Sequence, residues 1–150
     1  MLPQGYNSNY QIVQSPGYVM IIVEMITDVR IIPLDGRPAP PSQVQQYMGD
    51  SRGHWEGDTL VVDAKNFNDQ TWFDRAGNYH SDALHVVERY TVSSPDHILY
   101  EVTIDDPKVF SRTWKMSMPI YRRVDKNVTL LEYECVFYIQ EEKYKNAPFK

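Results

Sequence analysis

The segment HSDALHVVER, residues 80–89, places two histidines, two carboxylates and an arginine within one short run. General acid–base chemistry needs a histidine or a carboxylate in a pocket of low polarity, which moves the pKa of that group toward neutrality. Glu88 suits this role because it falls between Val86 and Tyr90 on an apolar strand face. An arginine beside it could stabilise an anion, and a tyrosine could donate a hydrogen bond. The candidate catalytic residues are His85, Glu88, Arg89 and Tyr90.

The same carboxylate also has a purely structural interpretation. A buried carboxylate must be paired or hydrogen-bonded, and the arginines and tyrosines of this chain could form an interior ion pair with Glu88. Glu24, which falls between Ile22 and Ile26, is in a similar position. The spacing does not separate a catalytic from a structural role, so both stay open.

Histidine and carboxylate side chains would also suit a transition-metal site. Along a strand, however, His80 and His85 fall on opposite faces. A loop could still bring them together, with His54 from an earlier hairpin as the third ligand. The chain contains no HExxH, Cys-x-x-Cys or His-x-His motif. We therefore favour surface or structural roles for these histidines and expect no cofactor. The single cysteine, Cys135, lies in an apolar run and is interpreted as a small buried hydrophobe.

Composition excludes several classes of protein. The 150 residues carry a formal net charge of −5, and no basic face of the kind that binds nucleic acid is visible. No apolar run approaches the roughly 18 residues that cross a bilayer, since the longest, VMIIV, ends at Glu24. The first ten residues are polar and do not read as a signal peptide. We expect no nucleic-acid partner and no membrane partner.

Alternating runs bounded by Gly, Pro, Asn and Asp predict about eight strands and almost no helix. The predicted strands are residues 17–26, 27–36, a hairpin over 54–67, 83–93, 97–106, 113–124 and 129–139. Two long loops, residues 36–53 and 68–82, separate them, and the first could hold one helical turn at Ser42–Tyr47. Short connections require antiparallel neighbours.

We therefore predict an all-β fold, an antiparallel up-and-down barrel of about eight strands with two long loops. One domain spans residues 1–150, with 1–10 and 140–150 peripheral. Barrel closure removes exposed strand edges, and an eight-stranded barrel can hold one small ligand. Each strand has one apolar and one mixed face. We favour the arrangement in which the apolar faces point inward and the polar residues are exposed to solvent. In the alternative, the polar faces line a cavity and form a binding or catalytic site.

Aromatic residues could build such a ligand site. Aromatic residues make up 13% of the chain, and several fall in the predicted loops. There they could form a lid or a stacking platform for a small ligand, or plug one end of the barrel as core. The candidate ligand-binding residues are Trp55, Trp72, Phe73, Tyr79, Tyr100 and Trp114.

Five ordered motifs carry a resemblance: LPQGYNSNYQIVQSPGYV, VRIIPLDGRP, GDSRGHWEGDTLVVD, HSDALHVVER and YEVTIDDPKVF. Together, over roughly residues 2–135, they resemble a family of uncharacterised proteins abundant in soil bacteria and metagenomes. Members usually carry an export leader and an extra N-terminal segment, so the resemblance implies an exported or periplasmic protein and a chain shorter than the usual form. It implies no catalytic residues. The chain departs from the pattern at Ala39, where members often have histidine, and after Cys135.

The Gly-x-Trp-x-Gly-Asp hairpin followed by repeated strands is also similar to lipocalin-like, or calycin, barrels. The sequence thus leaves three functions open. The first is a barrel that binds a small, partly apolar or aromatic molecule. The second is a small cofactor-independent lyase, isomerase or hydrolase with a His/Glu acid–base pair. The third is a metal-dependent enzyme using His54, His80 and His85. A homodimer through an aromatic sheet face stays open as well.

Overall fold

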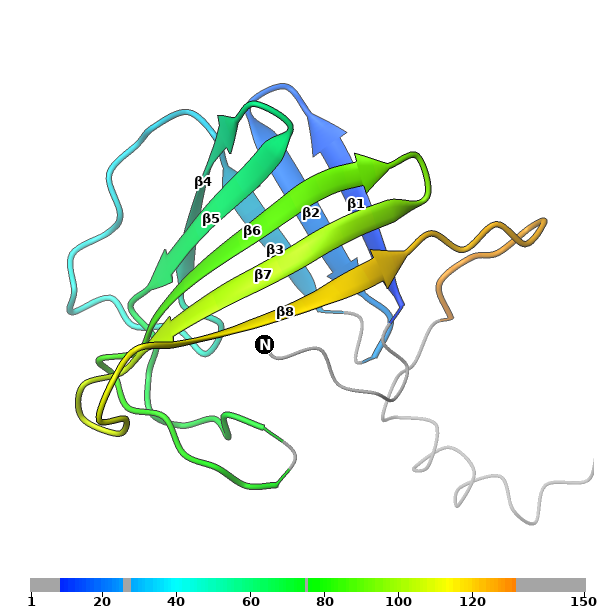
Figure 1. Cartoon of the computed structure of the whole chain (residues 1–150). Coiled ribbons are helices and arrows are strands. Elements are labelled where there is room, and N and C mark those ends of the chain that lie inside the picture. Colours follow the sequence, from blue (N-terminus) through cyan, green and yellow to red (C-terminus); the bar gives the residue numbers. More distant parts are fainter. Residues whose placement is uncertain (1–8, 26–27, 75, 132–150) are drawn as a thin grey trace, which may run out of the picture.

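The computed structural model describes residues 9–25, 28–74 and 76–131, which form eight antiparallel strands (Figure 1). The strands are β1 Tyr10–Ser15, β2 Tyr18–Val23, β3 Val29–Pro33, β4 Asp50–Glu56, β5 Thr59–Lys65, β6 His85–Ser94, β7 His97–Asp105 and β8 Trp114–Tyr121. No helix occurs among the described residues, and so none there could cross a membrane. The all-β prediction is confirmed.

The strands pair as two antiparallel sheets. β1, β2 and β3 form one sheet in that order, and β4 to β8 form the other, also in chain order. β3 lies beside β4, where the two sheets meet (Figure 1), but no backbone ladder joins these two strands. Within the described part of the chain the strands therefore do not form one closed barrel.

The predicted strand positions match the structure for β2 to β8, with three differences. β1 was not predicted, because its polar residues Gln11, Gln14 and Ser15 hide the strand pattern; within the described part of the chain it is an edge strand that pairs with β2. The helical turn predicted at Ser42–Tyr47 is instead an irregular loop. The predicted strand at residues 129–139, with Cys135, lies almost entirely outside the described residues.

The apolar strand faces point toward the interior, as favoured from the sequence. On β6, Val86 and Glu88 are buried. Val87, which lies between them, and Arg89, which follows Glu88, are partly exposed. On β7, Tyr100, Val102 and Ile104 are buried on the same inner face. Alternation alone therefore carries Glu88 inward together with its apolar neighbours.

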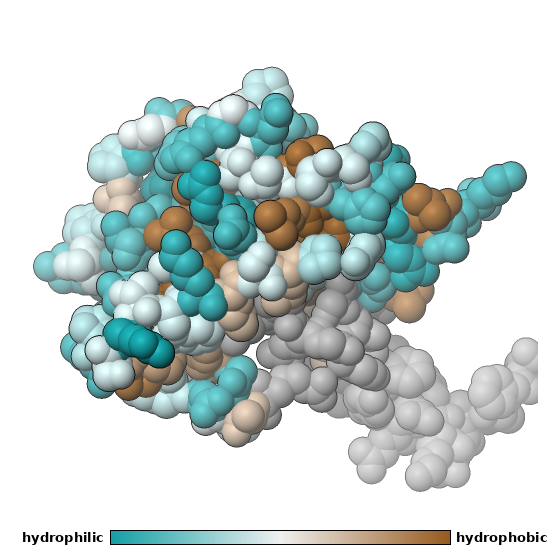
Figure 2. Space-filling view, viewed as in Figure 1, coloured by the Kyte–Doolittle hydropathy of each residue, from teal (hydrophilic) through white to brown (hydrophobic). Residues whose placement is uncertain are grey.

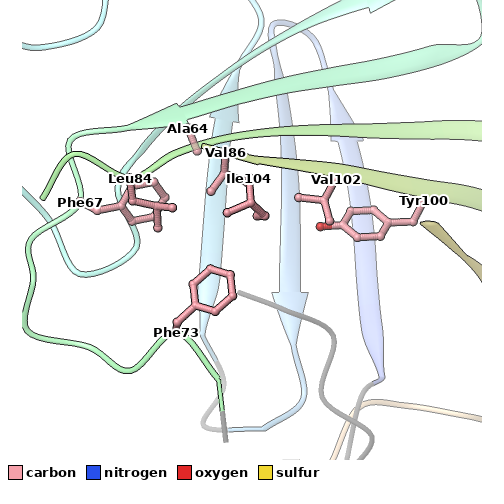
Figure 3. Packing of buried hydrophobic residues seen from close by; sticks show 8 residues of the cluster. All are labelled: Ala64, Phe67, Phe73, Leu84, Val86, Tyr100, Val102 and Ile104. Atoms are coloured by element: carbon pink, nitrogen blue, oxygen red, sulfur yellow. The ribbon is translucent and has the colours of Figure 1, made fainter. Parts of the chain in front are cut away.

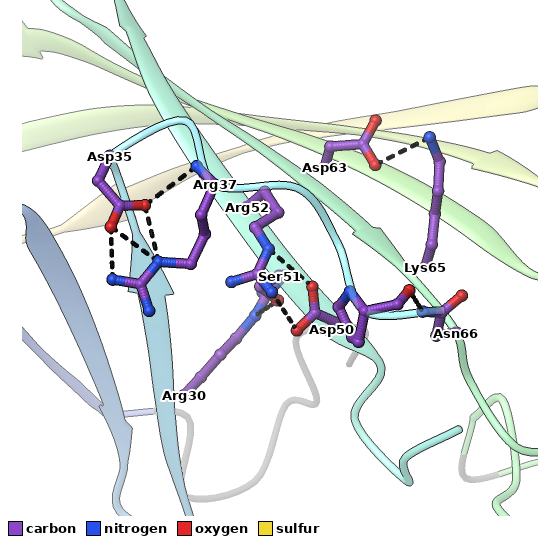
Figure 4. Close-up of polar contacts among 10 residues, drawn as sticks. Arg30, Asp35, Arg37, Asp50, Ser51, Arg52, Asp63, Lys65 and Asn66 are labelled. Atoms are coloured by element: carbon purple, nitrogen blue, oxygen red, sulfur yellow. Dashed lines mark hydrogen bonds and ion pairs between the residues drawn. The ribbon is translucent and has the colours of Figure 1, made fainter. Parts of the chain in front are cut away.

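The meeting line of β3 and β4 is closed by side chains. Arg30 of β3 donates from Nε to Ser51 Oγ of β4 at 2.8 Å, and Figure 4 shows the guanidinium reaching across to that strand. Gly53 of β4 faces Ile32 and Leu34 so closely that a Cβ on it would lie 2.7 and 2.8 Å from their side chains. A residue without a side chain thus lets the two sheets approach.

Two clusters of buried apolar residues lie between the sheets. The smaller joins both sheets, and its members are Val19, Ile21, Ile32, Leu60 and Val62. The larger occupies the end of the five-stranded sheet that the loop after β5 covers (Figure 3). Its members are Ala64, Phe67, Phe73, Leu84, Val86, Tyr100, Val102 and Ile104. We call this region the packed end.

The loop that covers the packed end is anchored by a buried carboxylate. Asp106, only 1% exposed, accepts hydrogen bonds from the backbone N–H and the hydroxyl of Ser81, both at 2.7 Å, and from Lys108 N–H at 3.2 Å. His80 beside it donates to or accepts from Thr71 Oγ1 at 2.7 Å and packs edge-on against Phe67. These contacts fix the loop over the sheet.

Candidate functional site

The other end of the interior is hollow. A cavity of about 850 Å³, partly open to solvent, lies between the two sheets near the β6–β7 turn. Its volume is in the range of small-molecule sites in proteins. Its wall combines aliphatic residues with polar residues and tyrosines, and the aliphatic ones include Ile12, Ile21, Val92, Ile98, Ile120 and Leu130. We call this region the hollow end.

Glu88 lies at the inner limit of the cavity and organises a polar cluster. Its Oε2 lies 2.5 Å from Nη1 of Arg30, and the two side chains expose only 3% and 9% of their surface. Its Oε1 accepts hydrogen bonds from the hydroxyls of Tyr90, at 3.0 Å, and Tyr100, at 2.9 Å. All four residues of this polar cluster line the cavity.

Strand pairing explains why these groups meet. Tyr90 and Tyr100 are directly opposite each other on β6 and β7, and their ring centroids are 5.0 Å apart. Glu88 precedes Tyr90 by two residues, so it lies on the same face. Arg30 comes from β3 in the facing sheet. The cluster therefore links the two sheets through an ion pair.

Burial and charge determine the protonation of the partners. Burial alone would lower the pKa of Arg30, but Glu88, Tyr90 and Tyr100 together raise it above its usual value. Burial and the adjacent carboxylate raise the pKa of Tyr90 and of Tyr100 well above its usual value. Both hydroxyls are therefore protonated at neutral pH and donate to Glu88.

Arg30 keeps one donor that no described residue satisfies. Its Nε is bonded to Ser51 and its Nη1 to Glu88, but Nη2 is buried without a hydrogen-bond partner in the described part of the chain. A buried unsatisfied donor costs about 1–3 kcal/mol. On the other side of the cluster, Glu88 Oε2 has the ion pair with Arg30 but no hydrogen-bond partner among the described residues.

His85 and Arg89, the other two candidate catalytic residues, lie on the outer face of the five-stranded sheet. His85 Nε2 contacts Asp63 Oδ2 at 2.9 Å, and Arg89 Nη2 donates to Glu56 at 2.8 Å. Figure 2 shows hydrophilic residues over much of the visible surface, with hydrophobic residues between them. The structure therefore brings Glu88 and Tyr90 to the cavity and leaves His85 and Arg89 outside.

The three histidines considered as metal ligands lie in three separate places. His54, on β4, is exposed and contacts Glu56 at 3.1 Å. His80 is buried in the loop over the packed end, and His85 is on the outer face. Within the described ranges no three His, Cys, Asp or Glu residues are grouped so that they could hold a metal ion.

The candidate ligand-binding aromatics are also dispersed. Tyr100 lines the cavity. Phe73 and Trp114 pack against each other at the packed end, with ring centroids 5.9 Å apart. Trp55, Trp72 and Tyr79 are exposed, Trp72 most of all at 78%. Trp72 and Phe73 border a second, much smaller pocket of about 130 Å³.

Two parts of the site were missed in the sequence. Arg30 was not singled out, although one arginine inside the apolar run VRIIP is a signal that its partner is a buried carboxylate. The second is the connection after β8, which returns to the three-stranded sheet. There Leu131 N–H donates to Glu24 Oε1 at 3.0 Å, and Asn9 Nδ2 donates to Oε2 at 2.7 Å.

No family model, curated protein or solved structure matches the chain. The resemblances noted in the sequence therefore stay predictions. The function must be argued from the cavity and the residues around it.

Proposed function

We propose that this protein binds a small, partly apolar molecule in the cavity at the hollow end. The observation that carries the proposal is the cavity itself, about 850 Å³ between the sheets. Aliphatic walls with a few convergent polar groups are the usual composition of a ligand pocket. Here the polar groups of the lining include the four that contact one another, Arg30, Glu88, Tyr90 and Tyr100.

We also propose that the strands enclose the ligand as in a lipocalin-like barrel. The strands follow one another in chain order across both sheets, and β3 lies beside β4. This is the strand order of an up-and-down barrel. The connection after β8 contributes Val128, Thr129 and Leu130 to the cavity wall, between the outer strands β8 and β1.

The state of Glu88 favours binding over acid–base catalysis. Its carboxylate already accepts from two tyrosines and pairs with an arginine. A general base needs a lone pair aimed at the substrate proton. The histidine proposed to work with it, His85, lies on the opposite side of the sheet, next to Asp63. The polar cluster is therefore better suited to orient a ligand.

Binding can be tested with a neutral fluorescent hydrophobe, N-phenyl-1-naphthylamine. Ile98 and Leu99 are neighbours on β7; Ile98 lines the cavity, and Leu99 is exposed on the other face. The native protein is expected to bind the probe saturably. Ile98→Trp fills the cavity and is expected to weaken binding at least tenfold, whereas Leu99→Trp is expected to leave it unchanged.

Two results would overturn the proposal. One is the absence of saturable probe binding to the native protein. The other is an equal loss of binding in Ile98→Trp and Leu99→Trp, because the probe would then not be in the cavity. Circular dichroism of both variants checks that the fold is retained.

A further inference from the structure

We propose that the ligand of the cavity carries a narrow, unbranched apolar tail, and that this tail passes the side chain of Met48 into the small pocket at the packed end. The proposal rests on the binding function above and specifies the shape of the ligand. The cavity of about 850 Å³ and the small pocket of about 130 Å³ share three lining residues, Met48, Glu88 and Tyr100. The two spaces therefore adjoin, and these side chains form the wall between them.

Two of the three shared residues are the fixed part of this wall. The hydroxyl of Tyr100 donates to Glu88 at 2.9 Å, and Glu88 pairs with Arg30. Tyr100 and Glu88 are 3% and 2% exposed. Figure 3 shows Tyr100 at one end of the packed side chains, with Phe67 at the other end. Displacing either shared residue would break the hydrogen bond between them.

Met48 is the movable part of the wall. The backbone around it is anchored, because Gln46 pairs with Phe67 in an isolated β-bridge. Gly49 packs so closely that a Cβ on it would lie 2.7 Å from the carbonyl oxygen of Lys65. The Met48 side chain is 36% exposed, and methionine has three rotatable bonds and no strong hydrogen-bonding group. Rotation of this side chain alone would join the two spaces.

The lining of the small pocket suits an apolar tail better than a polar group. Its polar side chains are already bonded: Thr71 Oγ1 and His80 Nε2 share a hydrogen bond at 2.7 Å, and the hydroxyl of Tyr47 donates to Gln70 at 3.1 Å. A charged group placed there would lose its water without gaining a partner. The apolar lining residues include Phe67, Leu84, Val86, Val102 and Ile104.

The sizes of the two spaces determine which part of the ligand enters which. The small pocket is a fraction of the volume of the cavity, so it admits only a narrow group, while the body of the ligand stays in the cavity. In the competing arrangement the whole ligand lies in the cavity and the small pocket is a packing defect of the core. The shape of the tail is then unimportant for binding.

Two isomers separate these arrangements: 4-n-octylphenol and 4-tert-octylphenol, which have the same atoms but a linear and a branched tail. Each is used to displace N-phenyl-1-naphthylamine from the native protein. The linear isomer is expected to bind about tenfold more tightly, because each methylene that is buried in an apolar pocket tightens binding about fourfold. Equal affinities are expected if both tails lie in the wide cavity.

Val86 and Val87 are neighbours on β6 and supply a matched pair of variants. Val86 is buried and lines the small pocket, whereas Val87 is partly exposed on the outer face. Val86→Phe fills the small pocket and is expected to abolish the preference for the linear isomer while leaving 4-tert-octylphenol unchanged. Val87→Phe is expected to change neither affinity. Met48→Phe, with a stiffer side chain in the wall, is expected to act like Val86→Phe.

A crystal structure of the native protein with 4-(8-bromooctyl)phenol locates the tail directly. The anomalous signal of the bromine is expected in the small pocket, among Phe73, His80 and Val86. This measurement decides the matter even if a variant does not fold.

The outcomes separate this inference from the proposed function. Equal affinity of the two isomers for the native protein, or a bromine in the large cavity, overturns the inference and leaves the binding function standing. An unchanged preference in Met48→Phe overturns the passage at Met48. If neither the naphthylamine nor any of the phenols binds, both proposals are wrong.

Discussion

The two ends of the interior differ although the same strands build them. Ile98 and Ile104 lie on the same inner face of β7. Ile104 is 2% exposed inside the packed cluster, whereas Ile98 borders the cavity. The alternation of the strand is therefore the same at both ends, and it does not decide which end is filled.

The loops and turns that connect the strands determine which end of the interior is filled. At the packed end, the loop after β5 brings Phe67 and Phe73 over the sheet, and the loop after β7 brings Phe110 against Phe73, with ring centroids 5.8 Å apart. At the hollow end, β6 and β7 are joined by a tight turn at Ser94–His97, which supplies no large apolar side chain, and the connection after β8 places Val128 and Leu130 in the cavity wall without filling the cavity. A sheet thus becomes a core or a binding site according to what its loops carry.

The largest expected effect on stability comes from truncating one isoleucine at each end of the interior. Ile104→Ala is expected to lower the free energy of unfolding by about 2–5 kcal/mol, because Ile104 is only 2% exposed and its truncation enlarges the small pocket beside it. Ile98→Ala is expected to cost under about 1 kcal/mol, because the space beside it is already empty. Urea denaturation measures both. Equal losses would contradict the division into a packed and a hollow end.

A smaller effect is expected at the loop anchor. Asp106→Ala leaves the Ser81 N–H and hydroxyl without their acceptor, at a cost of about 1–3 kcal/mol. Among the described residues, the neighbouring Asp105 side chain accepts from Thr113 Oγ1 at an exposed position, so Asp105→Ala is the control, with a cost under about 1 kcal/mol.

The same pair of variants tests whether the ends are independent. Asp106→Ala is expected to make the loop at residues 68–84 more sensitive to limited proteolysis. Naphthylamine binding is expected to stay unchanged, because Asp106 does not line the cavity. A parallel loss of probe binding would show that the two ends are coupled.

The smallest effect concerns pH at the hollow end. Hydrogen bonds from Leu131 N–H and the Asn9 amide lower the pKa of Glu24 below its usual 4.5. Since the folded-state pKa is lowered, the contribution of Glu24 is present above pH 4.5 and is lost as the pH falls through the folded-state value. Hydrogen-exchange protection of the Leu131 amide is expected to decline below about pH 4.5.

Two comparisons check this assignment. The Leu34 amide, which donates to the carbonyl of Gly17 at 2.9 Å, should keep its protection over the same pH range, because no carboxylate holds it. In Glu24→Gln the pH dependence at Leu131 is expected to disappear. Persistence of the decline in that variant would assign it to another group.

The faces of the strands could be predicted because side chains alternate between the two faces of a strand, a pattern that depends only on neighbouring residues. From the sequence, Glu88 with Tyr90 was one of two alternatives for the cavity side, and burial selects it over His85 with Arg89. The partner of Glu88 was not predictable in the same way. Arg30 is brought to it across the two sheets, over a long and irregular connection whose path is not encoded in any local pattern.

Which strands pair, and whether they close into one barrel, could not be predicted from local sequence patterns either. Barrel closure was predicted from short connections, but residues 34–49 between β3 and β4 are neither short nor regular. The two strands meet without a ladder, and glycine at position 53 sets how closely they approach. β1 was missed because the polar side of an edge strand carries no apolar signal.

The side-chain junction between β3 and β4 gives the molecule a mechanical property. A change in the angle between the sheets breaks no backbone ladder there; it strains the Arg30–Ser51 bond, the Arg30–Glu88 ion pair, the contacts of Gly53 and the smaller apolar cluster, which joins both sheets. The two sheets are therefore held to each other along this line by side-chain contacts. Arg30 contacts Ser51 of β4 and Glu88 of β6, so one side chain ties β3 to two strands of the facing sheet beside the cavity.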